Sequence, residues 1–151
     1  MKIISHRGNL IGPNPDRENS ISYIHDAFEA GFDVEIDLRT KNNELYLGHD
    51  YAQHPVTLNW LVDNNSKLLI HIKDIKAIEL IKDFDLHYFI HYNDPNVLTS
   101  QKFLWSHNIN ESNSELSIIP LLGIEDINSY LNNKKSYYGI CTDFPILLQS
   151  K

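Results

Sequence analysis

The fold of this chain is decided by residues 33–38, which read DVEIDL. Acidic and apolar residues alternate here, as they do in a strand with one polar and one apolar face. Residues i and i+2 of a strand point to the same side, so Glu35 and Asp37 present their carboxylates next to each other. Adjacent carboxylates repel each other unless a proton, a basic partner or a cation lies between them. Hard divalent cations such as Mg²⁺ or Ca²⁺ take oxygen ligands, so the pair predicts a metal site.

Short polar motifs surround this strand along the chain. In order they are HRG (6–8), ENS (18–20), EID (35–37), HD (49–50) and TDFP (142–145). Together they resemble the pattern HRG, ENT, ExD, HD, ExK and TDxP of the glycerophosphodiester phosphodiesterases, within the phospholipase-C-like phosphodiesterases. Each motif alone is weak, but this order is improbable by chance. One motif departs from the family pattern, because HIK (71–73) stands where ExK is expected.

The resemblance implies an α/β fold of the (β/α)8 barrel type. Such barrels typically take about 250 residues, whereas this chain has 151. We therefore expect a shortened barrel, with several helices reduced or missing, that forms a single domain over residues 1–151. The resemblance also implies a metal-dependent phosphodiesterase that cleaves a glycerophosphodiester-like substrate to an alcohol and a phosphomonoester such as glycerol phosphate.

Hydrophobic periodicity predicts that strands and helices alternate, which implies parallel strands with right-handed crossovers. The polar stretch 108–115 predicts a surface loop. Capping residues predict helices that start at Asn19 or Ser20, at Thr57 and at Asp94-Pro95. The expected strands are 2–5, 32–40, 45–47 (a hairpin return), 68–72, 88–91, 103–105, 116–120 and 138–142, and further helices are expected at 75–84, 125–131 and 145–148.

Two histidines, His6 and His49, are the candidate general acid and base. Phosphodiester cleavage needs one group that deprotonates a nucleophile and another that protonates the leaving alkoxide, and histidine titrates in the range that suits both tasks. A single histidine at a strand end is more often structural, so the assignment depends on the whole set of motifs. His91 and His107 follow predicted strands and are weaker candidates for the rim of the barrel, which is formed by the carboxyl ends of its strands.

The metal-ligand candidates are Glu35, Asp37 and His71, with an exposed acidic strand face as the alternative. The family pattern has a carboxylate at position 71, and imidazole is a good ligand for Mn or Zn but a poor one for Mg or Ca. Three outcomes stay open: a changed metal preference, a metal held by two carboxylates and water, or a weakened site.

The phosphate-binding candidates are Arg7 and Lys73. A guanidinium matches phosphate oxygens in a bidentate way, although Arg7 could instead form a surface ion pair with Asp16 or Glu18. Lys73 shares a strand face with the residue at position 71. We expect Glu18 to orient Arg7 or His6, or to hold its loop, and the aspartate of the last motif, Asp143, to serve the structure.

Composition narrows the classes of partner. With 13 Lys and Arg against 20 Asp and Glu, the net charge of −7 argues against a nucleic-acid-coating surface and against an electrostatic membrane patch. A single cysteine, Cys141, excludes an internal disulfide, and no apolar run is long enough to span a membrane. We expect a cytoplasmic protein that binds a small-molecule phosphodiester, and the sequence does not indicate its oligomeric state.

Two rival functions remain at this point. The first is a non-catalytic phosphoester-binding domain with a degenerate metal site, which the short length and His71 both favour. The second is a lyase similar to the spider-venom phospholipases, although those are secreted and disulfide-bonded. The sequence also leaves open whether water or a neighbouring hydroxyl of the substrate attacks first, the latter giving a cyclic phosphate.

Overall fold

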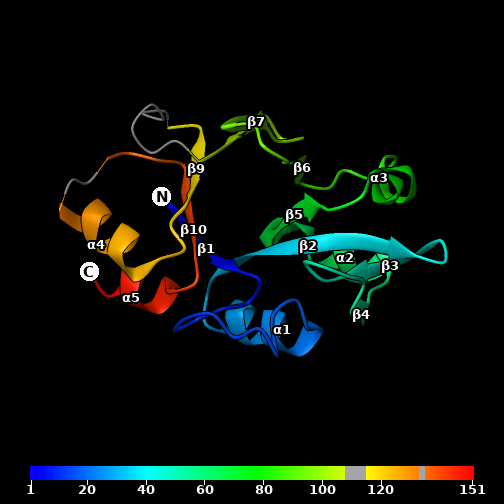
Figure 1. Ribbon diagram of the computed structural model, residues 1–151, viewed down its shortest axis with the longest axis horizontal. Coiled ribbons are helices and arrows are strands. Elements are labelled where there is room, and N and C mark those ends of the chain that lie inside the picture. Colours follow the sequence, from blue (N-terminus) through cyan, green and yellow to red (C-terminus); the bar gives the residue numbers. More distant parts are fainter. Residues whose placement is uncertain (108–114, 133–134) are drawn as a thin grey trace.

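The computed structural model describes residues 1–107, 115–132 and 135–151, and the loop expected at 108–115 lies, except for its last residue, outside these parts. The described chain forms a mixed α/β fold in which helices pack outside a curled sheet (Figure 1). Its elements are β1 (Lys2–His6), α1 (Ile21–Glu29), β2 (Asp33–Lys41), β3 (Glu44–Leu47), β4 (His54–Pro55), α2 (Leu58–Asp63), the 3₁₀ turn η1 (Asn65–Lys67), β5 (Leu68–Ile72), α3 (Ile75–Ile81), β6 (Tyr88–Ile90), β7 (Asn96–Leu98), β8 (Leu104–Ser106), β9 (Ser117–Pro120), α4 (Ile124–Asn132), β10 (Gly139–Thr142) and α5 (Pro145–Gln149).

The parallel strands pair in the order β6-β5-β2-β1-β10-β9-β8. Their carboxyl ends therefore meet at one edge of the sheet, where parallel α/β folds place their functional residues. The register aligns His6 with Glu35 across β1 and β2, and Asp37 with His71 across β2 and β5. Strands β3 and β4 extend the far end of β2 as an antiparallel hairpin, as the sequence predicted for β3.

The sheet curls without completing an eight-stranded barrel. Among the described residues no hydrogen-bonded ladder joins β6 to β8; β7 pairs antiparallel with β8 beside them. Stacked rings of Phe89 and Trp105, whose centroids are 4.5 Å apart, bring the inner faces of β6 and β8 together. The expectation of a shortened (β/α)8 barrel is thus confirmed only in part: the described residues form a curled α/β sheet with five α-helices.

The helix expected to start at Asp94-Pro95 is wrong. The chain instead forms β7, which turns back through residues 99–103 to pair with β8. The turn is closed by backbone hydrogen bonds from Thr99 N to Phe103 O (2.7 Å) and from Lys102 N to Thr99 O (2.9 Å). A short helix at this position would be marginally stable in itself. As a strand, β7 instead forms backbone hydrogen bonds with β8. The local capping signal therefore lost to strand pairing.

Apolar side chains fill both sides of the sheet. The cluster inside the curl contains one residue from each of β1, β5, β6, β8, β9 and β10, and it closes the interior below the polar edge. For five of these residues a polar residue follows two positions later, at the end of the strand or just past it. These pairs are Ile4 and His6, Leu69 and His71, Phe89 and His91, Trp105 and His107, and Cys141 and Asp143.

Helix capping follows the sequence closely. The hydroxyls of Ser20 and Thr57 accept hydrogen bonds from the first turns of α1 and α2, which confirms both predicted caps. The helices α1 and α3 pack their apolar faces on the outer side of β2 and β5. No helix in the described parts of the chain is long and apolar enough to cross a membrane.

Candidate active site

The centre of the polar edge is the carboxylate pair of β2 together with His71 of β5. Glu35 and Asp37 are buried, with exposed fractions of 1% and 0%. His71 Nδ1 lies 3.6 Å from Glu35 Oε1 and 3.4 Å from Asp37 Oδ1. One potential ligand atom from each of the three residues lies within 4.8 Å of the others. The strand parity read from the sequence therefore places all three on one inner face.

Two carboxylate oxygens of this cluster, Glu35 Oε2 and Asp37 Oδ1, have no hydrogen-bond donor among the described residues. A buried carboxylate oxygen without a donor is costly, because burial removes its hydration. Divalent cations take such oxygens as ligands, and the imidazole of His71 adds a nitrogen. The three side chains therefore fit a divalent metal ion.

Asp37 is the most tightly held residue of the site. Asn19 donates from Nδ2 to Asp37 Oδ2 (2.9 Å) and accepts the Asp37 backbone N–H at 2.9 Å. Arg7 Nε lies 2.8 Å from the same Oδ2, in an ion pair that is not aligned as a hydrogen bond. Burial alone would raise the pKa of the Asp37 carboxyl, but the charge of Arg7 and the bond from Asn19 outweigh it and lower that pKa. Asp37 is therefore held as a carboxylate.

The cations predicted to bind phosphate both border the carboxylates. Arg7 also donates from Nη1 to Glu18 Oε2 at 3.1 Å, so Glu18 orients Arg7 as expected. The guanidinium is mostly buried, so this contact is not the surface ion pair considered from the sequence. Lys73 Nζ lies 3.8 Å from Asp37 Oδ1. The structure thus brings Arg7 and Lys73 to opposite oxygens of Asp37.

His6 enters the site from the end of β1. Its Nδ1 lies 2.7 Å from Asp143 Oδ1, and its Nε2 lies 3.9 Å from Glu35 Oε2. Burial by itself lowers the pKa of His6, but the bond to Asp143 and the charge of Glu35 raise it above the usual value overall. The sequence predicted only a structural role for Asp143. The structure shows that this carboxylate also contacts the His6 ring. An anionic Asp143 selects the tautomer with the proton on Nδ1 and turns Nε2 toward the carboxylates.

His49, the second histidine of the predicted pair, is joined to the site through its backbone. Gly48 donates its N–H to the Asp37 carbonyl at 3.0 Å, so the loop after β3 lies beside the middle of β2 (Asp33–Lys41), next to the carboxylate pair. Arg39 Nε donates to the His49 carbonyl at 2.9 Å. The His49 side chain is half-exposed, and its Nδ1 lies 2.7 Å from Asp50 Oδ1. Among the contacts of the described residues, none joins its imidazole to the carboxylate cluster.

Two further histidines extend the edge beyond His71. The His71 ring stacks on Phe89 with centroids 4.6 Å apart, and its Nε2 lies 3.5 Å from the His91 carbonyl. The rings of His91 and His107 lie 4.3 Å apart. Burial and the neighbouring histidines lower the pKa of His107, whose Nε2 accepts the Trp105 indole N–H at 2.9 Å. Both histidines reach the rim, as the strand ends predicted.

Three polar residues hold the predicted ones: sequence reasoning missed Asn9, considered Asn19 only as a helix cap, and gave Asp143 only a structural role. All three are buried. Asn19 belongs to the ENS motif and has a positive φ of 62°, a conformation that asparagine tolerates better than most residues. The motif was therefore the available signal for Asn19. Asn9 follows the HRG motif directly, but nothing in a single sequence links it to position 143.

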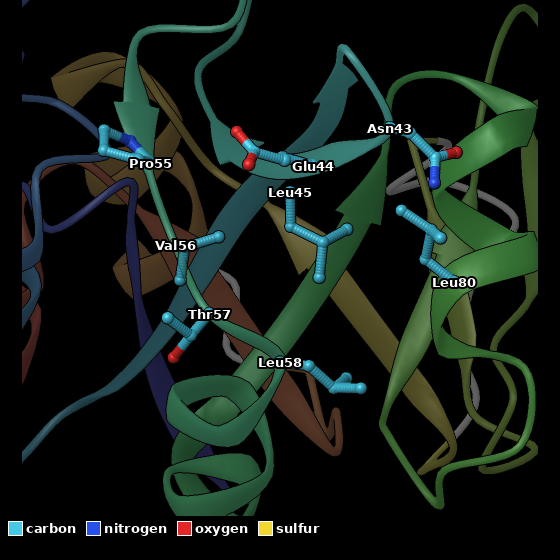
Figure 2. A pocket seen from close by; sticks show the side chains of 8 residues that line it. All are labelled: Asn43, Glu44, Leu45, Pro55, Val56, Thr57, Leu58 and Leu80. Atoms are coloured by element: carbon cyan, nitrogen blue, oxygen red, sulfur yellow. The ribbon is translucent and has the colours of Figure 1, made fainter.

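A separate groove lies away from the polar edge. It has a volume of about 620 Å³ and lies between the β3–β4 hairpin, the start of α2 and one side chain of α3 (Figure 2). Its lining residues are Asn43, Glu44, Leu45, Pro55, Val56, Thr57, Leu58 and Leu80. None of these residues belongs to the polar edge.

Comparison with solved structures finds a similar fold in one crystal structure with a TM-score above 0.5. A crystal structure of glycerophosphodiester phosphodiesterase from Agrobacterium tumefaciens str. C58 matches with a TM-score of 0.58 and 15% sequence identity, over 100% of both chains. A proposed glycerophosphodiester phosphodiesterase from Galdieria sulphuraria matches with a TM-score of 0.46 and 12% identity, over 99% of this chain and 96% of the other. No family model matches the chain, and no curated protein does. The resemblance drawn from the motifs thus has a counterpart in a shared fold.

Proposed function

We propose that this chain is a metal-dependent phosphodiesterase that cleaves a glycerophosphodiester-like substrate to an alcohol and a phosphomonoester such as glycerol phosphate. The carrying observation is the cluster of buried Glu35 and Asp37 with partly buried His71, in which two carboxylate oxygens lack a donor in the part of the chain that the structure describes. Arg7 and Lys73 border it with positive charge, and His6 borders it with a ring nitrogen. These are the groups that a phosphodiester needs for charge neutralisation and proton transfer.

Glu35, Asp37 and His71 would hold the cation. When bound, a divalent ion supplies charge neutralisation at the phosphate, with Mg or Ca favoured by the carboxylates and Mn or Zn by the imidazole. Arg7 and Lys73 would bind phosphate oxygens through their positive charges. Both cations already lie within 4 Å of Asp37. A bound phosphate would therefore compete with Asp37 for Arg7 and Lys73.

His6 carries the proton in this proposal. Its Nδ1–H is held by Asp143, so Nε2 is the atom that takes a proton from the attacking hydroxyl or gives one to the leaving alkoxide. His49 would perform the complementary transfer from the loop after β3, and the Asp50 carboxylate beside its Nδ1 would hold the ring in the matching tautomer. Water or a hydroxyl of the substrate can serve as the nucleophile in this arrangement.

The remaining expectations belong to the same proposal. The substrate is a small molecule, its breakdown falls within lipid metabolism, and residues 1–151 act as one domain. The cytoplasm fits the one cysteine, Cys141, which is buried with a free thiol.

A second candidate is a phosphoester-binding domain without turnover. The observation in its favour is that Asp37 already has Arg7, Lys73 and His71 within 4 Å, so its charge is compensated by the protein itself. Such a site could bind a phosphate anion through the same cations without metal chemistry. Metal content and turnover separate the two candidates.

The test starts from protein purified without chelators. We expect about one equivalent of divalent metal per chain, and hydrolysis of a chromogenic phosphodiester and of glycerophosphodiesters after loading with Mg, Ca, Mn or Zn. Glu35→Gln and Asp37→Asn are expected to abolish both metal binding and hydrolysis. Asp83→Asn, at an exposed carboxylate after α3, is the matched control that should change neither. Full metal affinity in the Asp37 variant would exclude the proposed centre, and metal binding without hydrolysis of any substrate would favour the second candidate.

A further inference from the structure

Asn9, which follows the HRG motif, lies behind the polar edge and is fully buried. Its Nδ2 donates to Asp143 Oδ1 at 2.7 Å and to Glu18 Oε1 at 2.9 Å. Its Oδ1 accepts the backbone N–H of Asn14 at 3.0 Å. The side chain thus uses both amide hydrogens on two carboxylates that come from distant parts of the chain.

The orientation of this amide is determined by chemistry. The Asn14 backbone N–H can only donate, so the Asn9 carbonyl oxygen must face it, and the NH₂ group must face the carboxylates. The Asn9 backbone is held as well, with its N–H donating to the His6 carbonyl (2.9 Å) and its carbonyl accepting the Ser5 hydroxyl (2.7 Å). A flipped amide would place two carboxylates against an oxygen and would leave the N–H without an acceptor.

A tight turn brings Asn9 back beneath His6. Arg7 and Gly8 both have positive φ, at 55° and 89°. A Cβ at Gly8 would lie 3.0 Å from the Tyr23 ring and 3.1 Å from its backbone, so glycine is needed there for both conformation and space. The HRG motif therefore builds the turn that places the next side chain between the two carboxylates.

We propose that Asn9 is a positioning residue that couples the histidine of the site to its arginine. One arm runs through Asp143 to His6 Nδ1 (2.7 Å), and the other runs through Glu18 to Arg7 Nη1 (3.1 Å). Asp143 and Glu18 thus each accept one hydrogen bond from Asn9. Asp143 also contacts His6, and Glu18 also accepts a hydrogen bond from Arg7. The spatial coupling is a property of the chain, whereas its effect on turnover rests on the phosphodiesterase proposed above.

Asparagine suits this position for a specific reason. It offers two donors from one nitrogen and one acceptor, at a side-chain length that spans both carboxylates from the turn. Aspartate has the same shape and would still accept the Asn14 N–H, but it would add a third carboxylate within hydrogen-bond distance of Asp143 and Glu18. Buried like charges at that spacing repel strongly. Alanine removes both donors without adding a charge, so aspartate is expected to be the worse replacement.

The first test reads the coupling without any activity. Nuclear magnetic resonance of the metal-free protein should show the His6 Nδ1–H and the Arg7 Nε–H, and Asn9→Ala should shift both signals. The Trp60 indole N–H, bonded to His25, reports on folding and should stay unchanged. Asn65→Ala is the matched control, because Asn65 also bridges two partners, the Asp85 carbonyl and the His87 N–H. It should move neither signal. A shift at only one of the two residues, or at neither, would overturn the coupling.

The second test uses kinetics. Partners that orient catalytic groups typically contribute about 10–100-fold. Asn9→Ala is expected to lower kcat through His6 and to raise KM through Arg7, each by about 10-fold on that scale, and Asn9→Asp should lose more of kcat/KM than Asn9→Ala. An aspartate variant that folds and keeps the parent kcat/KM would refute the role of the two donors. If the parent protein shows no turnover, the proposed function fails while the resonance test still decides the coupling.

Discussion

Replacing Arg7 with alanine isolates the interaction that holds the centre of the site. The guanidinium lies 2.8 Å from Asp37 Oδ2, and the Asp37 side chain is fully buried. Removing one partner of a buried ion pair leaves an uncompensated charge and costs about 3–5 kcal/mol. Lys73, at 3.8 Å, and the Asn19 amide remain on Asp37 and offset part of this cost. We therefore expect Arg7→Ala to lower the free energy of unfolding by about 3 kcal/mol at pH 7, the lower end of that range.

The assay is urea unfolding in the presence of a chelator, with Arg17→Ala as control. Arg17 Nη2 lies the same 2.8 Å from Asp26 Oδ2, but both side chains are nearly half exposed. Exposed pairs contribute about 0–1 kcal/mol, so this variant should be close to the parent. Equal losses in the two variants would refute the argument that burial of Asp37 sets the magnitude.

The sign of the pH dependence follows from the lowered pKa of Asp37. A carboxylate with a lowered folded-state pKa contributes stability that is present above its unfolded pKa and is lost as the pH falls through the folded value. The difference between the parent and Arg7→Ala should therefore shrink as the pH falls below about 4, the ordinary range of an aspartate. If the cluster binds a divalent cation as proposed, and only in the folded form, a concentration 100 times its Kd should add about 2.7 kcal/mol to the stability of the variant.

Three further outcomes are expected. His6→Ala and His49→Ala should fold normally and lose about 10²–10⁴ of the hydrolysis rate on a chromogenic phosphodiester; retention of more than about a tenth would remove that histidine from the acid–base pair. His71→Glu should strengthen Mg or Ca binding in calorimetric titration, since an anionic oxygen is the better ligand for these ions; unchanged affinity would mean that position 71 does not reach the metal. Burial, with a contribution from Lys2, lowers the pKa of His87 to about 4, so this histidine stays neutral in the folded protein while it takes up a proton in the unfolded one. The free energy of unfolding should therefore decrease as the pH falls from about 6.5 toward 4. His87→Gln should make this decrease smaller by about 1–2 kcal/mol, after allowance for solvent screening. Identical unfolding profiles over this pH range would contradict it.

The strand DVEIDL could be predicted because strand parity is a local property. Alternation alone places Glu35 and Asp37 on one face, and the apolar run at 68–72 predicts the neighbouring strand that carries His71. Their proximity then follows from parallel pairing, which puts the carboxyl ends of β2 and β5 at one edge. The candidate metal cluster was therefore within reach of the sequence.

The contacts that orient these residues were out of reach. Asn9 and Asp143 are separated by 134 positions, and their hydrogen bond depends on β1 and β10 being neighbours in the sheet. No local pattern encodes that pairing. The β7 hairpin was missed for the opposite reason, because a strong local signal at Asp94-Pro95 was overridden by a ladder with β8. Local rules thus brought the candidate metal cluster within reach, and tertiary contacts determined how its side chains are oriented.

His71 stands where the pattern of motifs has a glutamate, and its surroundings show how an imidazole is accommodated there. Its ring is fixed in plane by stacking on Phe89, and Nε2 lies toward the His91 carbonyl at 3.5 Å. A proton on Nε2 would leave the Nδ1 lone pair facing Glu35 Oε1 and Asp37 Oδ1, at 3.6 and 3.4 Å. Three electron-rich atoms at these distances repel unless a cation or a proton lies among them. The imidazole therefore either coordinates a metal together with the carboxylates or carries a proton that takes the place of that metal, and in both cases position 71 acts on the charge of the carboxylate pair.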